Sequence, residues 1–544
     1  MNESADPTRN YDESLWRGLY WLSWLIVVLF LTIGAVSAWQ HFDVKERPDG
    51  NEGHREIDFG GQWLMGRMIV EGEARNLYDR KTHRRILEQN YPRSDEAPGS
   101  STSDAEQLLI WMMEVPTAKG EPTIGGPLYP PVHAFYYAPI GLMSPRTGYR
   151  FMQLFTLLSM IPAGLGITLL SRGRIWWPVS CMILILYPGL GGNVNLGQNA
   201  HISLLLLIWG WVALSRGRPV LAGFIWGFFA FKPVWAVTFC LVPFLTRRWR
   251  MLFSMIVTGT TLALLTIPFV GIESWMHWIK IGGQASALYN VDQNWVNMSR
   301  DILGLSRRWQ IDFSQSHAEI HANWLKPTLW GWGMLLAIFE MTTRLTWTMP
   351  RAFRDPLGTG SAFLLLGVWF SCYHFMYYDV LLTALPVMLI VISLTKMIDI
   401  PRWSQCRGPG RPVRWELVLG VAFLTYFVLK AEAPFQFLPI VLMVLTLIPV
   451  LNQRFWRQEI LPKGRSLRSS ALALILITAL VSLNHLEWYI FFYLDLSRMM
   501  IPVDQFCLFA LWIWCAITCA TEEHTKRQTR DRKEGTKVER EQTA

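Results

Sequence analysis

The sequence predicts an all-α polytopic membrane protein, a bundle of about 12–14 membrane-spanning helices with two large outer loops. Apolar runs long enough to cross a hydrocarbon core recur along the 544 residues, of which 51% are hydrophobic. Only 17% of the residues are charged. A soluble chain of this length would divide into several domains, and their water-exposed surfaces would carry more charged residues than this. A soluble multidomain protein is therefore excluded.

The apolar runs define the expected spans. They lie at 17–39, 148–170, 175–190, 200–215, 219–246, 251–271, 325–345, 359–373, 378–396, 415–430, 434–451, 468–486 and 499–520. The run at 219–246 is interrupted by Lys232 and Pro233, and proline removes a backbone donor, so two short helices should meet there. With this run counted twice, about fourteen passes put both termini on one side of the membrane. The first run lacks a cleavage site and is predicted to be a retained anchor.

Lys and Arg are concentrated in alternate short loops, as they are in cytoplasmic loops. These residues are Arg172, Arg174, Arg216, Arg218, Arg247, Arg248, Arg250, Arg344, Arg351, Arg354, Arg402, Arg407, Arg411, Arg414, Arg454, Arg457, Lys463, Arg465 and Arg468. The intervening short loops hold almost none, and 191–199 and 371–378 have no Lys or Arg. We therefore predict a cell (inner) membrane protein whose N-terminal segment 1–16 and basic tail 521–544 are cytoplasmic, flanking a membrane domain at 17–520. The net charge of +9 follows from this topology, and nucleic acid is not an expected partner.

Two long loops, 40–147 and 272–324, then face outward. The first contains Asp58 at the start of a helix-like stretch and a Pro/Gly/Ser-rich segment at 92–127, compatible with either an ordered lid or a disordered insert. Asp58 has two interpretations. It could cap the helix by accepting a hydrogen bond from a free backbone N–H, or it could be a carboxylate that takes a proton at the outer face.

Polar residues collect near the outward ends of the predicted helices. They are Asp58, Tyr129, Asn193, Asn195, Gln198, Asn199, His201, Lys232, His374, Tyr377, Tyr378, Asp379, Glu432 and Asp495. Ionisable groups at membrane depth are costly and usually mark a water-filled site or pathway. We therefore predict a polar site at the outer face.

Several of these residues have simpler interpretations. Lys232 could extend its amine to the membrane interface, and His374 could hydrogen-bond a backbone carbonyl. Asn199 fits the N-cap of the following helix, and Tyr129 precedes a Pro-Pro pair that should start one. Glu432 and Asp495 are assigned no role.

Four motifs, in order, resemble glycosyltransferase family 87. They are DFGGQWLMGRMIVEGEARNLYD, YPPVHAFYYAPIGLM, LGQNAHISLLLLIWGWVAL and RPVLAGFIWGFFAFKPVWAVTFCLVPFLTRRWR. The later stretch SCYHFMYYDVLL is similar to the family in placing a His near an outer helix end. This group of GT-C-fold membrane enzymes includes polyprenyl-phosphate-mannose-dependent mannosyltransferases.

The resemblance implies a GT-C-like bundle and a hexosyltransferase that moves one sugar, mannose above all, from a polyprenyl-phosphate donor to an acceptor hydroxyl on a lipid or glycan. It places the general base at Asp58 and the donor-phosphate ligands at Lys232 and His374. The substrate-binding residues are then expected at Tyr129, Gln198, Asn199, Tyr378 and Asp379. With a single base and direct displacement, inversion at the anomeric carbon is expected.

No cofactor or metal is expected. No Asp-x-Asp pair stands out to hold a divalent ion, and the seven Cys are scattered without a CxxC pair. A lipid phosphate leaving group instead needs cationic or N–H donors in a site of low dielectric constant.

Two alternatives stay open. A transporter or flippase would use the same polar residues as half of a pathway, but would need ionisable groups through the midplane of its spans. A polysaccharide polymerase or ligase would need several Arg in one outer loop for a pyrophosphate, and Arg300, Arg307 and Arg308 offer such a group.

Overall fold

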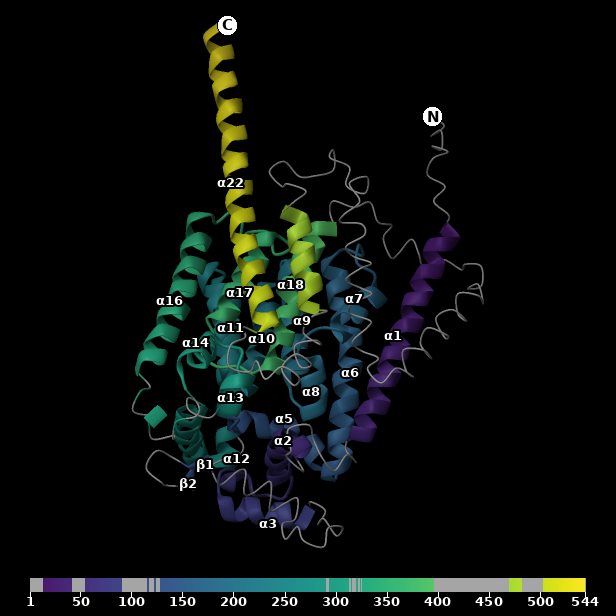
Figure 1. The fold of residues 1–544 in the computed structure, drawn as a ribbon, viewed down its shortest axis with the longest axis vertical. Helices are drawn as coiled ribbons and strands as arrows, with labels where there is room; N and C mark the ends of the chain where they lie inside the picture. The colour runs from purple at the N-terminus through teal and green to yellow at the C-terminus, as the bar shows by residue number, and fades with distance from the viewer. Residues whose placement is uncertain are drawn as a thin grey trace.

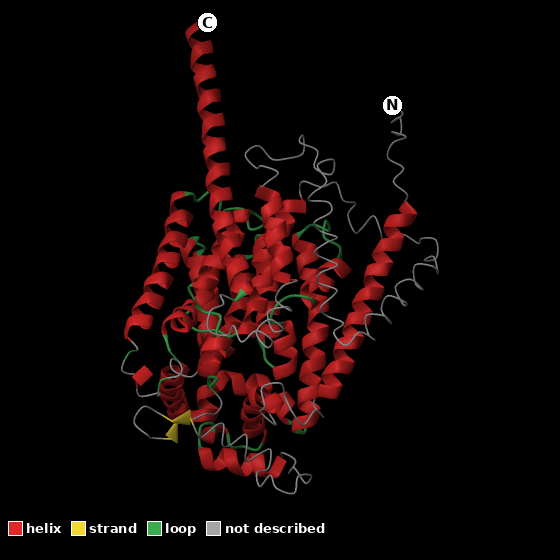
Figure 2. Cartoon of the chain, in the orientation of Figure 1, coloured by secondary structure: helices red, strands yellow, loops and turns green. Residues whose placement is uncertain are grey.

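The computed structural model describes residues 13–41, 54–90, 115–116, 122–123, 128–289, 293–312, 315, 319–320, 323, 325–395, 469–481 and 502–543. Nearly all the regular structure in these ranges is helical, apart from one short antiparallel pair of strands (Figure 2). The predicted all-α polytopic membrane protein is confirmed. The expected spans at 415–430 and 434–451, with Glu432 and Asp495, lie outside the described residues.

The elements follow one another in this order. The first half contains α1 (Glu13–His41), α2 (His54–Val70), η2 (Ala74–Asn76), α3 (Arg80–Asn90), β1 (Val115–Pro116), β2 (Pro122–Thr123), α5 (Pro131–Gly141), α6 (Pro145–Leu170), α7 (Trp177–Ile185), α8 (Leu190–Leu196), α9 (Ala200–Ser215), α10 (Pro219–Gly227), η3 (Phe228–Phe231), α11 (Pro233–Leu245) and α12 (Trp249–Tyr289). The second half contains α13 (Gln293–Met298), α14 (Ile302–Gln310), α16 (Leu325–Thr348), α17 (Thr359–Phe370), η4 (Tyr377–Thr383), α18 (Ala384–Thr395), a helix at Ser469–Val481 and α22 (Val503–Thr543).

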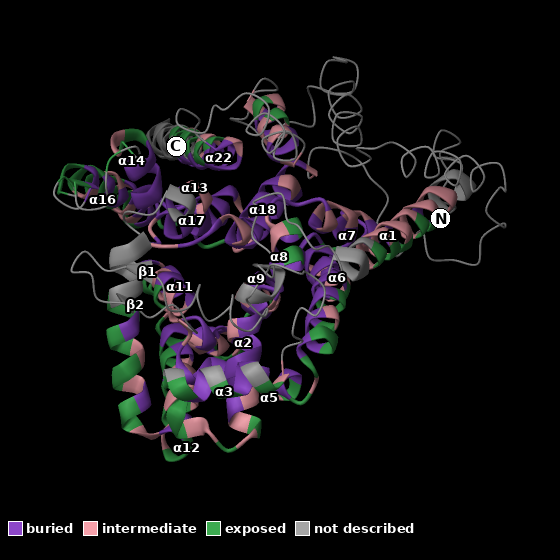
Figure 3. Cartoon of the chain, turned by 60° about the horizontal axis from the view of Figure 1, so that its bottom comes forward, coloured by how far each residue is buried: buried purple, intermediate pink, exposed green. Residues whose placement is uncertain are grey.

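Five helical stretches in the described ranges are long and apolar enough to cross a membrane. They are Gly18–Val36, Pro145–Leu170, Trp249–Gly283, Tyr377–Thr395 and Val503–Thr525. The pair α7 and α8, bent by 66°, makes a possible sixth. Shorter apolar helices, including α9, α11 and α17, pack beside them. Exposed apolar side chains such as Phe253 and Val257 lie along α12, as lipid-facing positions require (Figure 3).

The breaks in the helices follow the chemistry of the chain. Lys232 separates η3 from α11, with Pro233 as the first residue of α11, so the predicted pair of short helices is confirmed. Gly271, with φ of 76°, breaks α12 where the second outer loop was expected to begin. The predicted loop at 191–199 is wrong in part, because α8 occupies most of it.

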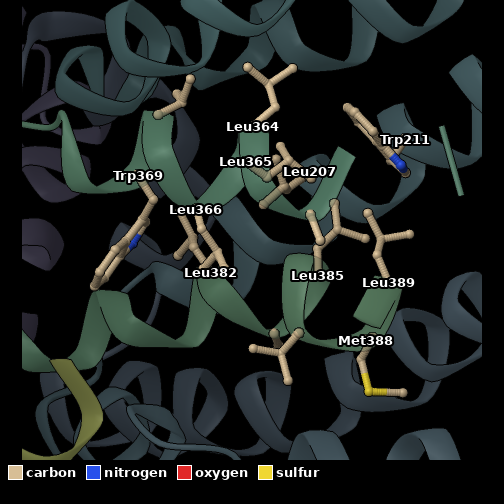
Figure 4. Packing of buried hydrophobic residues seen from close by; sticks show 14 of the residues in the cluster. Leu207, Trp211, Leu364, Leu365, Leu366, Trp369, Leu382, Leu385, Met388 and Leu389 are labelled. Atoms are coloured by element: carbon tan, nitrogen blue, oxygen red, sulfur yellow. The ribbon is translucent and has the colours of Figure 1, made fainter. Parts of the chain in front are cut away.

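Two hydrophobic clusters hold the fold together. The larger one joins α9, α17, η4 and α18, where Leu207, Trp211 and Trp369 interleave with leucines (Figure 4). The smaller cluster surrounds Phe59 and Trp63 of α2 and includes Tyr137 of α5. This second cluster forms the lower end of the molecule in Figure 1, opposite the end to which the start of α1 and the end of α22 point.

The crossing of α2 and α5 depends on two glycines. A Cβ added at Gly66 would collide with the carbonyl oxygen of Tyr137, and one added at Gly141 would collide with the backbone of Gly66. Small residues allow two helix backbones to approach this closely. The crossing fixes α2, which contains Asp58, against the helix that follows Tyr129.

Candidate functional site

Asp58 lies inside α2 and is half-buried. The helix begins at His54, so the interpretation of Asp58 as its N-cap is wrong. One turn later, Gln62 is fully buried and its Nε2 donates to the carbonyl oxygens of Asp58 at 3.1 Å and Gly197 at 3.2 Å. The turn between α8 and α9 is thereby held against the part of α2 that contains Asp58.

Gln198 and Asn199 form that turn. Asn199 Nδ2 donates to Gln62 Oε1 at 2.8 Å, so Asn199 occupies the N-cap position of α9 without capping it through its side chain. Asn193 takes over this task, because its Oδ1 accepts from the Ala200 N–H at 3.0 Å. Asn193 also contacts His201 Nδ1 at 2.9 Å. Asn193 and His201 are therefore structural contacts behind the turn.

Tyr129 joins the turn to the remaining site residues. Its hydroxyl donates to Gln198 Oε1 at 3.0 Å. Desolvation raises the pKa of Tyr129 well above its ordinary value, and the charges of Asp58 and Asp379 add to the shift. The phenol is therefore a neutral donor that lies within electrostatic reach of both carboxylates.

Lys232 is buried, with 8% of its surface exposed. Its Nζ donates to Asp379 Oδ1 at 2.6 Å, and Trp235 Nε1 donates to the same oxygen at 3.3 Å. The Nζ atom also lies 5.4 Å from the centre of the Tyr378 ring. Extension of this lysine to the membrane interface is therefore wrong, and the structure brings Lys232, Tyr378 and Asp379 together.

His374 faces a carboxylate. Its Nδ1 lies 3.6 Å from Asp301 Oδ2, and the side chain is 29% exposed. Asp301 is fully buried and accepts hydrogen bonds from Ser299 Oγ at 2.5 Å and from the Gly304 N–H at 2.6 Å. Burial alone would raise the pKa of Asp301, but the contacts with His374, Ser299 and Gly304 outweigh it and lower the pKa.

Backbone contacts join the loop at 272–324, the second predicted outer loop, to the segment that contains His374 and Asp379. Ser299 and Met376 form a β-bridge, and the Arg300 N–H donates to the Phe375 carbonyl at 3.0 Å. The Met376 N–H in turn contacts Asp379 Oδ2 at 3.5 Å. The Asp301–His374 contact and the Lys232–Asp379 pair thus belong to one connected structure.

His133 and Gln62 were missed by the sequence-based predictions. The His133 ring stacks between Tyr129 at 3.9 Å and Tyr137 at 4.5 Å, and burial lowers its pKa to about 3, which keeps it neutral. His133 and Tyr137, four residues apart, lie on one face of α5, and Tyr129 precedes this helix at the same spacing, a signal that was present in the motif YPPVHAFYY. Gln62 lies one turn after Asp58, on the same face of α2.

The described part of the chain contains no group of three or more His, Cys, Asp or Glu side chains that could hold a metal ion. The expectation that no metal or cofactor is needed stays a prediction.

Comparison with known proteins gives one match. The family model described as Glycosyltransferase family 87 matches residues 128–375. The matched stretch includes Tyr129, Gln198, Asn199, Lys232 and His374, whereas Asp58, Tyr378 and Asp379 lie outside it. No curated protein and no solved structure matches the chain.

Proposed function

Because the family model of glycosyltransferase family 87 matches residues 128–375, we propose that the chain is a membrane glycosyltransferase that moves a single sugar, mannose first of all, from a polyprenyl-phosphate donor. The acceptor is a hydroxyl of a lipid or glycan at the outer face of the cell (inner) membrane. Asp58 is the general base, and Lys232 and His374 bind the donor phosphate.

One observation supports this proposal above the others: a series of contacts joins Tyr129 to the surroundings of both Asp58 and Lys232. The Tyr129 hydroxyl donates to Gln198, and the next residue, Asn199, donates to Gln62, which in turn donates to the Asp58 carbonyl. The Tyr129 ring stacks on His133, whose ring contacts Phe231, the residue before Lys232. A half-buried carboxylate and a buried ammonium from distant parts of the chain are therefore connected through one phenol. A proton acceptor and a cation at one site are what an attack by a hydroxyl on a phosphate-linked sugar requires.

The proposed reaction is a direct displacement. The acceptor oxygen forms a bond to the anomeric carbon while Asp58 takes its proton, and the bond from that carbon to the phosphate oxygen breaks. The phosphate leaves with the electron pair, and Lys232 and His374 stabilise its added charge. Attack from the face opposite the leaving group inverts the anomeric centre.

The surroundings of Lys232 suit this task. Asp379 accepts one hydrogen bond from the ammonium and Tyr378 lies over it, so the cation is held in place before the donor arrives. A preorganised cation costs little rearrangement at the moment of reaction. Tyr129, Gln198 and Asn199 supply hydroxyl and amide groups for the hydroxyls of the sugar or acceptor.

The arginines of the second outer loop favour a donor with one phosphate over a polymerase-type diphosphate donor. Arg300 Nε donates to Asp504 at 3.0 Å, and Arg308 donates to the carbonyls of Val296, Asn297 and Ser299. Both side chains are engaged in holding the loop together. The cluster that a diphosphate would need is therefore reduced to Arg307.

Transfer of labelled mannose tests the proposal. Membrane vesicles with the wild-type protein should convert radiolabelled polyprenyl-phosphate mannose into a labelled lipid or glycan, and Asp58→Asn should lower the rate by about 10²–10⁴-fold, the usual contribution of a general base. Glu71→Gln is the matched control, because Glu71 follows the same helix and pairs with Arg67 at 2.8 Å.

Transfer that survives Asp58→Asn at the wild-type rate would remove Asp58 from the mechanism. Absence of transfer from polyprenyl-phosphate mannose and from other polyprenyl-phosphate sugars would refute the proposed donor class. The anomeric configuration of the product, read by NMR, tests inversion separately.

A further inference from the structure

Arg307 differs from its two neighbouring arginines. Arg300 is paired with Asp504, and Arg308 donates to three backbone carbonyls. Arg307 lies on α14 with 9% of its surface exposed, and within the described ranges its guanidinium makes neither a hydrogen bond nor an ion pair. Burial lowers the pKa of this guanidinium, although the charge of Asp301 opposes the shift.

Asp301 does not serve as the counter-ion of Arg307 by direct contact. Its oxygens already accept from Ser299 Oγ, from the Gly304 N–H and, at 3.4 Å, from the Phe375 N–H, and they face His374. These contacts fix the carboxylate as the N-cap of α14. Arg307 therefore feels the charge of Asp301 without donating to it.

The guanidinium nitrogens of Arg307 are open to water, although little of the side chain is exposed, so an anion can reach them. Arginine stays protonated in proteins and carries a fork of N–H donors. An anion with two or more oxygens, such as a phosphate, matches the fork in charge and geometry.

The position of Arg307 links it to the proposed donor site. Asp301, the N-cap of α14, lies 3.6 Å from His374 Nδ1, and Arg307 follows it on the same helix. The charge of Asp301 also acts on Arg307, and His374 belongs to the segment that leads to Asp379 and Lys232. Arg307 is therefore on the helix whose start contacts His374.

We propose that Arg307 is a binding residue for the phosphate of the lipid-linked donor, together with His374. This inference rests on the proposed function for the identity of the donor. It assigns to a single phosphate one member of the arginine group that the sequence offered for a pyrophosphate.

Binding of the released lipid product tests the inference without turnover. The full chain in detergent is titrated with polyprenyl phosphate, and affinity is measured for wild type, Arg307→Gln and Arg307→Lys. Loss of a charge-assisted hydrogen bond should weaken binding by about tenfold to a hundredfold in Arg307→Gln, and less in Arg307→Lys, which keeps the charge but lacks the fork. The matched control is Arg85→Gln, because Arg85 is 44% exposed, pairs with Glu73 at 2.6 Å and should leave the affinity unchanged.

Wild-type affinity in both Arg307 variants would overturn the inference. If Arg307→Gln fails to fold, Arg307→Lys still decides, since undiminished binding by it excludes a forked contact. Competition by phosphatidylglycerol vesicles as strong as by polyprenyl phosphate would assign Arg307 to ordinary lipid headgroups and overturn the donor role.

The two proposals can fail separately. Arg307-dependent binding of polyprenyl phosphate by a protein that transfers no sugar would sustain this inference and refute the proposed function. Sugar transfer from polyprenyl-phosphate mannose, together with unaltered affinity of the Arg307→Gln protein for polyprenyl phosphate, would support the proposed function and refute this inference.

Discussion

Lys232 and Asp379 show how the environment decides what a residue does. Both were expected at the outer face, but their pairing at 2.6 Å could not be predicted, because the residues are 147 positions apart. Asp58 shows the converse, since its position inside α2 excludes capping whereas its catalytic role stays a prediction.

At this scale we expect Asp379→Asn to destabilise the protein by about 3–5 kcal/mol, because a buried ammonium loses its counter-ion. Thermal unfolding in detergent measures the effect. Glu73→Gln is the control, since Glu73 is 29% exposed, its partner Arg85 is 44% exposed, and such a surface pair contributes about 0–1 kcal/mol.

The double variant Lys232→Met with Asp379→Asn should recover much of the lost stability, because both charges of the pair are then absent. It should not recover sugar transfer if Lys232 binds the donor. A double variant no more stable than Asp379→Asn would contradict the ion-pair explanation.

At the scale of elements, the crossing of α2 and α5 positions the end of the molecule that contains the candidate site. The sequence indicated the helix starting at Pro131 and the break at Lys232, since proline acts locally on the backbone. The close approach of Gly66 to Gly141 depends on which helices pack together, and the local sequence does not predict this pairing.

We therefore expect Gly66→Ala to separate α2 from α5 and to lower both the unfolding temperature and sugar transfer. The added methyl group meets the backbone of Tyr137, which cannot rotate away. Gly333→Ala on α16 is the control, because a Cβ there has no neighbouring atom within 4 Å. Unaltered stability and transfer in Gly66→Ala would show that the two helices can shift without consequence.

At the scale of the whole molecule, the described helices place the start of α1 and the end of α22 at one end and α2, α3 and α5 at the other (Figure 1). The placement of both termini on one side of the membrane stays a prediction. Which side is cytoplasmic stays a prediction from the basic loops.

Labelling of single cysteines in intact cells measures the orientation. An impermeant maleimide should react in intact cells with Arg75→Cys, near the candidate site. It should react with Arg351→Cys, in a basic loop, only after the cells are permeabilised. Both positions are exposed in the structure. The reverse pattern of labelling would show that the predicted orientation is wrong and that the proposed site lies on the cytoplasmic side.

The sequence by itself determined the membrane class, the helix break at Lys232, and the kinds of polar residue near the predicted outer helix ends. These follow from hydropathy and from local backbone chemistry, which act over a few neighbouring residues. Only the tertiary structure decided that Gln62 hydrogen-bonds Asn199 in the 198–199 turn and that His133 stacks on Tyr129. It also decided that Asp379 forms an ion pair with Lys232, and that the Arg307 side chain makes no hydrogen bond or ion pair within the described ranges. Each of these depends on contacts between elements far apart in the chain, because burial and charge pairing are properties of the packed molecule.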